Sequence, residues 1–138
     1  MRKIVWAAAC LFMFATAARA DVVAHISIAR QQMTVSVDGV PLHTWPVSTA
    51  RRPYATPRGS FRPIRLERKW YSRVYNNAPM PYAIFFYYGF AVHGTTETRS
   101  LGRPASHGCV RLPTSAAREL FELVRAHGMK NSRIVVGI

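Results

Sequence analysis

Cysteine is scarce in this chain of 138 residues, which contains only Cys10 and Cys109. No Cys-x-x-Cys pair accompanies the histidines, so the sequence offers no complete set of ligands for a zinc ion. If Cys10 is lost with an export signal, Cys109 has no partner for a disulfide and no resolving thiol for redox exchange. We therefore expect no metal and no other cofactor, and the remaining thiol requires another explanation.

Long hydrophobic runs are also absent. The apolar run at residues 4–16 is shorter than the roughly 20 residues that a membrane-spanning helix needs. Two basic residues precede this run and the small-residue site Ala18-Arg19-Ala20 follows it, which is typical of a secretory signal peptide, with an uncleaved anchor as the alternative. We expect residues 1–20 to be removed and residues 21–138 to enter the periplasm or the cell-wall space without stable membrane insertion.

Acidic residues are few, because 6 aspartates and glutamates stand against 19 lysines and arginines. Without the signal peptide 16 basic residues remain, and the formal charge is about +10, which favours an anionic partner. Nucleic acid is a poor candidate, because an exported protein rarely meets it and the basic residues are scattered. A carboxylate-rich extracellular polymer fits better. Residues 21–138 suffice for one domain, which we expect to be monomeric.

Alternating apolar and polar residues predict strands in the first half of the mature chain. This alternation covers residues 25–28, 33–37 and 40–45. The dipeptide Asp38-Gly39 separates the last two segments and favours a tight hairpin between them. Residues 48–63 are rich in Pro, Arg, Thr and Gly, which predicts a loop that leads into a short strand.

The second half contains an aromatic run, a helix and a final strand. Residues 82–92 are aromatic and apolar, which predicts a mostly buried strand or strand pair broken near Gly89. Apolar residues at helical spacing after Pro113 predict one helix that ends at Gly128, and residues 133–138 return to a strand. We therefore predict a mainly β fold, a barrel or sandwich that carries one C-terminal α-helix.

Reactive side chains occur at both ends of one loop. His93-Gly94 follows the aromatic run, and Ser106-His107-Gly108-Cys109 ends the loop. Amide chemistry by a thiol needs an imidazole that takes and returns a proton, together with backbone donors for the oxyanion. His93 is the predicted base, because a sixteen-residue excursion can bring Cys109 back beside it. Gly108 permits a tight turn that directs backbone amides toward the developing negative charge.

The charges near the thiol favour a reactive cysteine. We expect the paired histidine and local positive charge, including that of Arg111, to lower the pKa of Cys109. Arg111 can equally receive a substrate carboxylate, because a guanidinium binds a carboxylate in a bidentate manner. A buried, inert cysteine is the plain alternative, and it is the commoner fate of a lone cysteine.

Other residues carry weaker signals. The irregular residues 70–81 contain aromatic side chains that we interpret as a flap over the site, namely Trp70, Tyr71 and Tyr75. The remaining histidines are interpreted as ordinary strand, loop and helix-end residues: His25, His43 and His127.

The reactive motifs resemble the L,D-transpeptidase catalytic domain family, whose signature is a histidine followed, after a loop, by Ser/Thr-His-Gly-Cys. In this sequence the signature is His93 and then Ser106-His107-Gly108-Cys109. The segment Thr56-Pro57-Arg58-Gly59-Ser60-Phe61 resembles the family's Thr-Pro-x-Gly-x-Phe, and Leu101-Gly102-Arg103-Pro104-Ala105 leads into the cysteine motif as in the family. The resemblance covers nearly all of residues 21–138.

This resemblance implies a mainly β catalytic domain that acts on peptidoglycan stem peptides. Cys109 attacks a tetrapeptide stem on the L-residue side of a diamino acid, releases D-alanine and forms a thioester. The amine of a second stem or of a wall-attached protein then resolves the thioester. His93 is implied as the general base, and the Gly94 carbonyl as the group that orients its imidazole.

The resemblance also implies roles for the residues around the nucleophile. His107 and Gly108 are expected to supply polarity around the oxyanion together with Cys109, and Ser106 to support the loop. A loop-packing role for His107 is the alternative. We expect three residues to lie around the bound substrate: Gly94, Ser106 and Arg111.

Two positions depart from the family pattern. Ala50 stands where glycine is usual, and Arg111 stands where some members have asparagine. These departures leave the acceptor open, so a hydrolase that uses the same acyl-enzyme and a non-catalytic basic wall-binding module stay under consideration. If Cys109 is a nucleophile, carbapenem-type β-lactams should acylate it, whereas a binding module predicts no such adduct.

Overall fold

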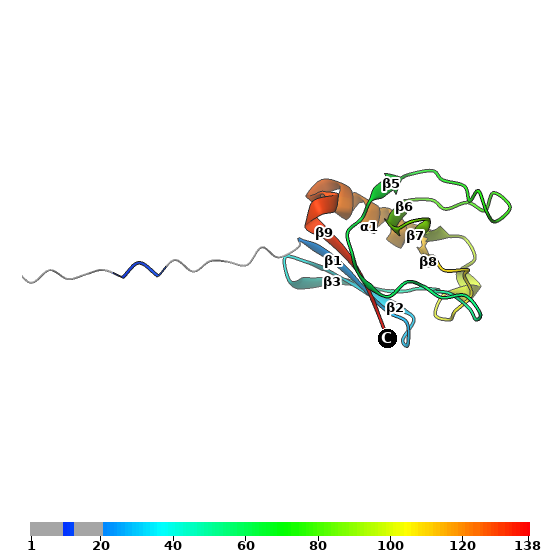
Figure 1. Cartoon of the computed structure of the whole chain (residues 1–138), viewed down its shortest axis with the longest axis horizontal. Helices are drawn as coiled ribbons and strands as arrows, with labels where there is room; N and C mark the ends of the chain where they lie inside the picture. Colours follow the sequence, from blue (N-terminus) through cyan, green and yellow to red (C-terminus); the bar gives the residue numbers. More distant parts are fainter. Residues whose placement is uncertain (1–9, 13–20) are drawn as a thin grey trace, which may run out of the picture.

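The computed structural model describes residues 10–12 and 21–138. The predicted signal peptide lies outside these residues apart from positions 10–12, so its cleavage stays a prediction. Within the described part of the chain, no helix combines the length and the apolar character needed to cross a membrane. From residue 21 onwards the chain forms two β-sheets that share a core with one helix (Figure 1).

The strands of the described chain divide into two sheets, and the last strand returns to the first sheet. The first sheet contains β1 (Val22–Ser27), β2 (Gln32–Val37), β3 (Val40–Pro46), β4 (Gly59–Phe61) and β9 (Ser132–Gly137). The second sheet contains β5 (Arg65–Glu67), β6 (Ala83–Tyr87), β7 (Phe90–Thr95) and β8 (Val110–Pro113). Helix α1 spans Thr114–His127, and the short 3₁₀ helices η1 and η2 span Thr98–Ser100 and Met129–Asn131. The predicted mainly β fold with one C-terminal helix is confirmed.

The first sheet has the strand order β3-β2-β1-β9-β4. Strands β2 and β3 form the predicted hairpin, with φ of 51° at Asp38 and 80° at Gly39. Two consecutive positive φ angles are those of a type I′ turn, which Asp-Gly favours. Strand β9 lies parallel to β1, so both ends of the described domain complete the same sheet.

The second sheet has the strand order β5-β6-β7-β8. The aromatic run forms β6 and β7, which are separated near Gly89 as predicted. Phe85 and Phe86 are buried, whereas Tyr88 in the turn is 79% exposed. Strands β5 and β8 are not evident from the sequence, because three or four residues are too few to display alternation. The unpredicted strand β8 pairs in parallel with β7.

Helix α1 packs against both sheets and closes the core. It begins directly after Pro113 and ends before Gly128, where φ is 95°, in agreement with the prediction. Its apolar stripe enters the shared core through Ala116, Ala117, Leu120, Phe121 and Val124. Burial of each large side chain here contributes about 1.5–3 kcal/mol to folding, and the packing holds the end of β8 firmly against the core.

The second sheet is covered on both faces. Ile84 and Val92 point into the shared core, and the neighbouring positions along the same strands point the other way. Three of those neighbours, Ala83, Phe85 and Ala91, form a smaller apolar cluster with Met80 from the preceding segment, and Trp70 and Cys109 pack against this cluster. Residues 68–82, between β5 and β6, therefore supply a second layer over the outer face of this sheet.

Candidate active site

The parallel pairing of β7 with β8 brings the two reactive residues together. His93 lies opposite Arg111 in the register, and Cys109 immediately precedes β8. Residues two apart in an extended chain share a face, so Cys109 lies on the face of Arg111 and diagonal to His93. Both Cys109 and His93 line one cavity of about 800 Å³. The structure thus places the predicted nucleophile and base at the same cavity.

His93 is buried, with 6% of its surface exposed. Its Nδ1 lies 2.7 Å from the carbonyl oxygen of Gly94. A carbonyl oxygen only accepts hydrogen bonds, so Nδ1 carries the proton and Nε2 keeps a lone pair. Burial lowers the pKa of His93 to about 4, the Gly94 hydrogen bond opposes this shift, and the charge of Arg111 adds to it. His93 is therefore neutral at pH 7, as a general base must be.

The thiol of Cys109 does not have the low pKa expected from the sequence. Burial raises the pKa of Cys109, and a backbone hydrogen bond with Ala91 and the charge of Arg111 oppose that effect. The expectation is wrong because the sequence shows the charges near the thiol but not the apolar cluster that excludes water from it. The thiol of Cys109 and the imidazole of His93 are therefore both neutral in the free protein at pH 7.

Two buried hydroxyl groups hold the turn that carries the thiol. Ser106 Oγ donates to the Cys109 carbonyl at 2.6 Å and accepts from the Gly108 N–H at 3.0 Å. Thr56 Oγ1 donates to the Gly108 carbonyl at 2.9 Å and accepts from the Ala50 N–H at 3.0 Å. Because both side chains are buried, water does not compete for these bonds. The hydroxyl of Ser106 is thus engaged within the loop that it was expected to support.

Position 108 requires glycine for two reasons, its backbone angle and its close contact with Phe90. Its φ is +146°, and a Cβ built there would lie 2.3 Å from Phe90 Cε1. Only glycine fits such a position without displacement of its surroundings. The Gly108 N–H is donated to Ser106 Oγ, so this amide does not point to an oxyanion. In the described part of the chain the Cys109 N–H makes no hydrogen bond, and this amide is the available donor.

Gly94 also has no room for a side chain. A Cβ at Gly94 would lie 2.9 Å from the Thr114 Cα at the start of α1. The Gly94 N–H donates to the Pro81 carbonyl at 2.8 Å, while its own carbonyl binds His93. These contacts agree with the predicted role of Gly94 in orienting the imidazole, and they link the base to the segment that covers the cavity.

Arg111 supplies positive charge to the cavity. Its backbone is held by Ser48 through two hydrogen bonds of 2.9 and 3.0 Å. Its Nη1 lies 3.6 Å from Glu97 Oε2, beyond the roughly 2.7–2.9 Å of a charge-assisted hydrogen bond. The guanidinium therefore keeps donors available for an incoming anion, which agrees with the carboxylate-binding role considered for Arg111.

His107 joins three loops through one imidazole. Arg51 Nη2 lies 2.9 Å from its Nε2, and the Tyr75 ring stacks on it with centroids 4.1 Å apart. Tyr54 meets the ring edge-on at 4.7 Å. Because Arg51 only donates, Nε2 accepts, and desolvation followed by the charges of Arg51 and Arg111 lowers the pKa of His107. These contacts favour the loop-packing interpretation of His107.

The structure places the three aromatic residues that were interpreted as a flap at different positions. Tyr75 lines the cavity. Trp70 instead packs edge-on against Phe85, with ring centroids 5.6 Å apart, and Tyr71 is exposed outside the cavity lining. Aromatic character alone does not reveal which side of an irregular segment faces the site, because no fixed period relates its residues.

The described residues contain no group of three or more His, Cys, Asp and Glu side chains that could hold a metal ion. Two of the remaining histidines make surface contacts. His43 stacks on Trp45 with ring centroids 4.7 Å apart, and His127 Nδ1 lies 3.6 Å from Asp21 Oδ2. Neither histidine lines the cavity with Cys109.

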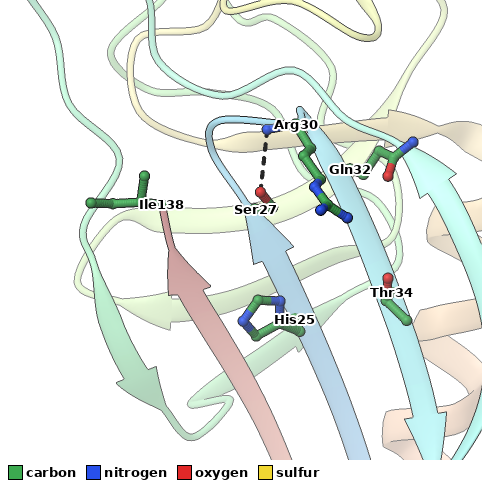
Figure 2. Close-up of a pocket in the computed structure, with 6 residues that line it drawn as sticks. All are labelled: His25, Ser27, Arg30, Gln32, Thr34 and Ile138. Atoms are coloured by element: carbon green, nitrogen blue, oxygen red, sulfur yellow. Dashed lines mark hydrogen bonds between the residues drawn. The ribbon is translucent and has the colours of Figure 1, made fainter.

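The third, His25, lies on the outer face of the first sheet. A hollow of about 260 Å³ lies there, in which the Arg30 backbone N–H donates to Ser27 Oγ at 3.2 Å. Figure 2 draws the residues that line it. The hollow is lined by His25, Ser27, Arg30, Gln32, Thr34 and Ile138. It shares no residue with the cavity that contains Cys109 and His93.

Three residues of the site were not evident from the sequence, namely Arg51, Thr56 and Glu97. Thr56 belongs to a recognised segment, but its bond to Gly108 joins residues 52 positions apart and depends on the fold. Arg51 reaches His107 across a similar separation of 56 positions. Glu97 did carry a signal, because it is the only acidic residue between His93 and Cys109.

Sequence comparison connects this site to known proteins. The family model described as the L,D-transpeptidase catalytic domain matches residues 21–136. A curated relative from Bacillus subtilis strain 168, named "Putative L,D-transpeptidase YkuD", is 27% identical over 105 residues. This alignment covers 72% of the chain and 58% of the relative.

Solved structures with the same architecture carry related names. An L,D-transpeptidase from Mycobacterium smegmatis has a TM-score of 0.76 at 26% identity, over 86% of this chain and 59% of that one. An L,D-transpeptidase from Stackebrandtia nassauensis has a TM-score of 0.75 at 26% identity, over 94% and 62%. A third, solved in complex with imipenem, has a TM-score of 0.75 at 26% identity, over 85% and 59%. The chain spans about three fifths of the length of each of these relatives.

Proposed function

The chain belongs to the L,D-transpeptidase catalytic domain family, and from this membership we propose that it is a cysteine acyltransferase that cross-links peptidoglycan stem peptides. Cys109 is the nucleophile and His93 is the general base. The observation that carries this proposal is the hydrogen bond from His93 Nδ1 to the Gly94 carbonyl, at the cavity that also contains Cys109. It fixes the tautomer whose Nε2 can accept the thiol proton.

The first half-reaction forms the thioester. Cys109 Sγ attacks the carbonyl carbon on the L-residue side of the diamino acid while its proton moves to His93 Nε2. The Cys109 N–H donates to the oxyanion of the tetrahedral intermediate. The carbon–nitrogen bond then breaks, His93 returns the proton to the leaving amine, and D-alanine departs.

The second half-reaction forms the new amide. The neutral amine of a second stem attacks the thioester carbonyl and gives a proton to His93 Nε2. The carbon–sulfur bond breaks, and the departing thiolate regains that proton from His93. Proton transfer between two neutral groups suits the buried pair, because neither the raised pKa of Cys109 nor the lowered pKa of His93 favours a charged resting state.

Electrostatics supports an anionic substrate. The chain carries a formal net charge of +13, which attracts an acidic polymer irrespective of its sequence. Arg111, with donors that are not saturated by Glu97, is placed to bind a carboxylate of the stem peptide. We also propose export to the periplasm or the cell-wall space, which the N-terminal sequence pattern supports.

The test is mass spectrometry of wild type and Cys109→Ala with two compounds, read on the released products for the first and on the intact protein for the second. A disaccharide-tetrapeptide should yield cross-linked dimers with wild type alone, and imipenem should add one adduct to wild type alone. The imipenem complex of the structural neighbour supports the choice of that probe. We expect Cys109→Ala to lose at least about 1,000-fold in acylation, because it lacks the nucleophile.

Ser27→Ala is the matched control, because it removes a small polar group on the outer face of the first sheet. It should leave both reactions unchanged. Trimmed stems without dimers would indicate a hydrolase with the same thioester. Wild type that forms neither adduct nor product would contradict the proposed chemistry.

A further inference from the structure

Charge is distributed unevenly around the cavity that contains Cys109. Of the described residues that line this cavity, Glu97 and Arg111 are the two with permanently charged side chains. Glu97 is also the only acidic residue between Glu67 and Glu119. Its N–H donates to Thr95 Oγ1 at 3.0 Å, which sets the point where its side chain leaves the end of β7. A site for carboxylates alone would be weakened by a carboxylate beside its arginine.

The two charges are close but not locked together. Arg111 Nη1 and Glu97 Oε2 are 3.6 Å apart, and the Glu97 side chain is 74% exposed. An exposed pair of this kind is weak. A ligand that brings both a carboxylate and an ammonium can therefore replace this single contact with two charge-assisted hydrogen bonds of its own.

The remaining wall of the cavity suits an aliphatic group. Its apolar lining consists of Val74, Ala78, Pro79, Met80, Pro81 and Phe90. A methylene chain gains free energy when it is removed from water against such a wall. The cavity thus combines two opposite charges with an apolar surface, which is the pattern of an amino-acid zwitterion on an aliphatic stem.

We propose that Glu97 and Arg111 form a binding site for the amino-acid zwitterion of the acceptor. At the end of a diamino-acid side chain, one carbon atom carries both an ammonium and a carboxylate. Glu97 binds this ammonium, and Arg111 binds this carboxylate. This inference rests on the proposed function, because it identifies the acceptor that resolves the thioester. The bound ammonium releases one proton to solvent before attack, and His93 takes the second as the amide bond forms.

Binding without turnover tests the pair directly. Calorimetric titrations of Cys109→Ala use 2-aminoheptanoic acid, its amide, which lacks the carboxylate, and heptanoate, which lacks the ammonium. We expect the zwitterion to bind about tenfold more tightly than either partial analogue. When Glu97→Gln is combined with Cys109→Ala, binding of the zwitterion should weaken about three- to fivefold, and binding of heptanoate should not weaken. When Arg111→Gln is combined with Cys109→Ala, binding of both the zwitterion and heptanoate should weaken.

Glu119→Gln is the matched control, because its carboxylate lies on α1, 2.7 Å from His43, and outside the cavity lining. It should change none of the three affinities. Equal affinity of heptanoate and the zwitterion, or no effect of Glu97→Gln on the zwitterion, would overturn the inference and leave Glu97 as a neutraliser of Arg111.

Turnover separates this inference from the proposed function. With the cysteine intact, Glu97→Gln should raise KM for a zwitterionic acceptor about three- to fivefold, whereas Glu119→Gln should leave this KM and acylation by imipenem unchanged. A normal adduct with an unchanged acceptor KM would refute only the zwitterion site. If wild type forms no thioester while Cys109→Ala binds the zwitterion as expected, the proposed reaction fails and the binding site stands.

Discussion

The two sheets share one core but differ in what lies on their other face. The outer face of β1 and β2 is open and polar, and its hollow is lined by polar side chains and by the C-terminal Ile138 (Figure 2). The outer face of β6 and β7 lies beneath residues 68–82, which add an apolar cluster and the wall of the cavity. Water exclusion on that second face lowers the pKa of His93 and raises that of Cys109. The pKa shifts of both groups therefore depend on the cover over this sheet face, and four measurements test the contrast between the two faces.

Gly108→Ala should have the largest effect. The added Cβ would overlap Phe90 Cε1 at 2.3 Å, beside the cavity, and φ is +146°. We expect a loss of about 4 kcal/mol in stability from overlap and backbone strain together, and at least about a 100-fold loss in acylation by imipenem.

Gly102→Ala is the matched control, because φ is +91° there but no atom lies within 4 Å of the added Cβ. It should cost about 1–2 kcal/mol from strain alone, as measured by urea unfolding, with acylation unchanged. Equal losses for the two variants would show that the contact with Phe90 does not restrict the nucleophile turn.

Acid should destabilise the protein through His93. Its folded pKa of about 4 lies below the ordinary 6.5, so between these values the unfolded chain takes up a proton that the folded chain does not. This contribution is complete above pH 6.5 and is lost as the pH falls toward 4, by about 3 kcal/mol. Urea unfolding at pH 4–7 should show this slope in wild type and a shallower one in His93→Asn. Identical slopes would contradict the buried, neutral imidazole.

Thr56→Val should remove the hydroxyl that donates to the Gly108 carbonyl and accepts from the Ala50 N–H, without a change in side-chain shape. We expect about 2 kcal/mol of destabilisation from the unpaired buried groups and about a tenfold slower acylation. Thr56→Ser should restore both values, because it keeps the hydroxyl. Thr34→Val, on the exposed face of β2, should stay within about 0.5 kcal/mol of wild type. A similar loss at Thr34 would remove the distinction between the faces.

Tyr75→Ala should have the smallest effect of the four. It removes a stacked contact with His107, which contributes about 0.5–1.5 kcal/mol beyond buried area. Acylation by imipenem, measured as a second-order rate constant, should change less than about tenfold. Tyr88→Ala, at the exposed turn between β6 and β7, should change nothing. A 100-fold loss at Tyr75 would assign it direct contact with the substrate in place of a covering role.

Short-range signals predicted much of the fold. The Asp38-Gly39 turn and the helix between Pro113 and Gly128 were correct because backbone preference and apolar periodicity act within a few residues. Strand β8 was missed because its four residues carry no period of their own, although its pairing with β7 aligns the site. The fold class was therefore predictable, while the pairing that positions Cys109 was not.

Residue identity and spacing alone show which groups are present: one thiol within residues 21–138, a histidine at the end of the aromatic run, and a glycine where the turn admits no side chain. The protonation, hydrogen bonding and neighbours of these groups depend on the tertiary structure. The direction of the Cys109 pKa shift, the hydroxyl of Thr56 on Gly108 and the position of Glu97 beside Arg111 all depend on residues far apart in the chain. Burial and hydrogen bonding are properties of that packing, so residue identity and spacing alone do not determine them.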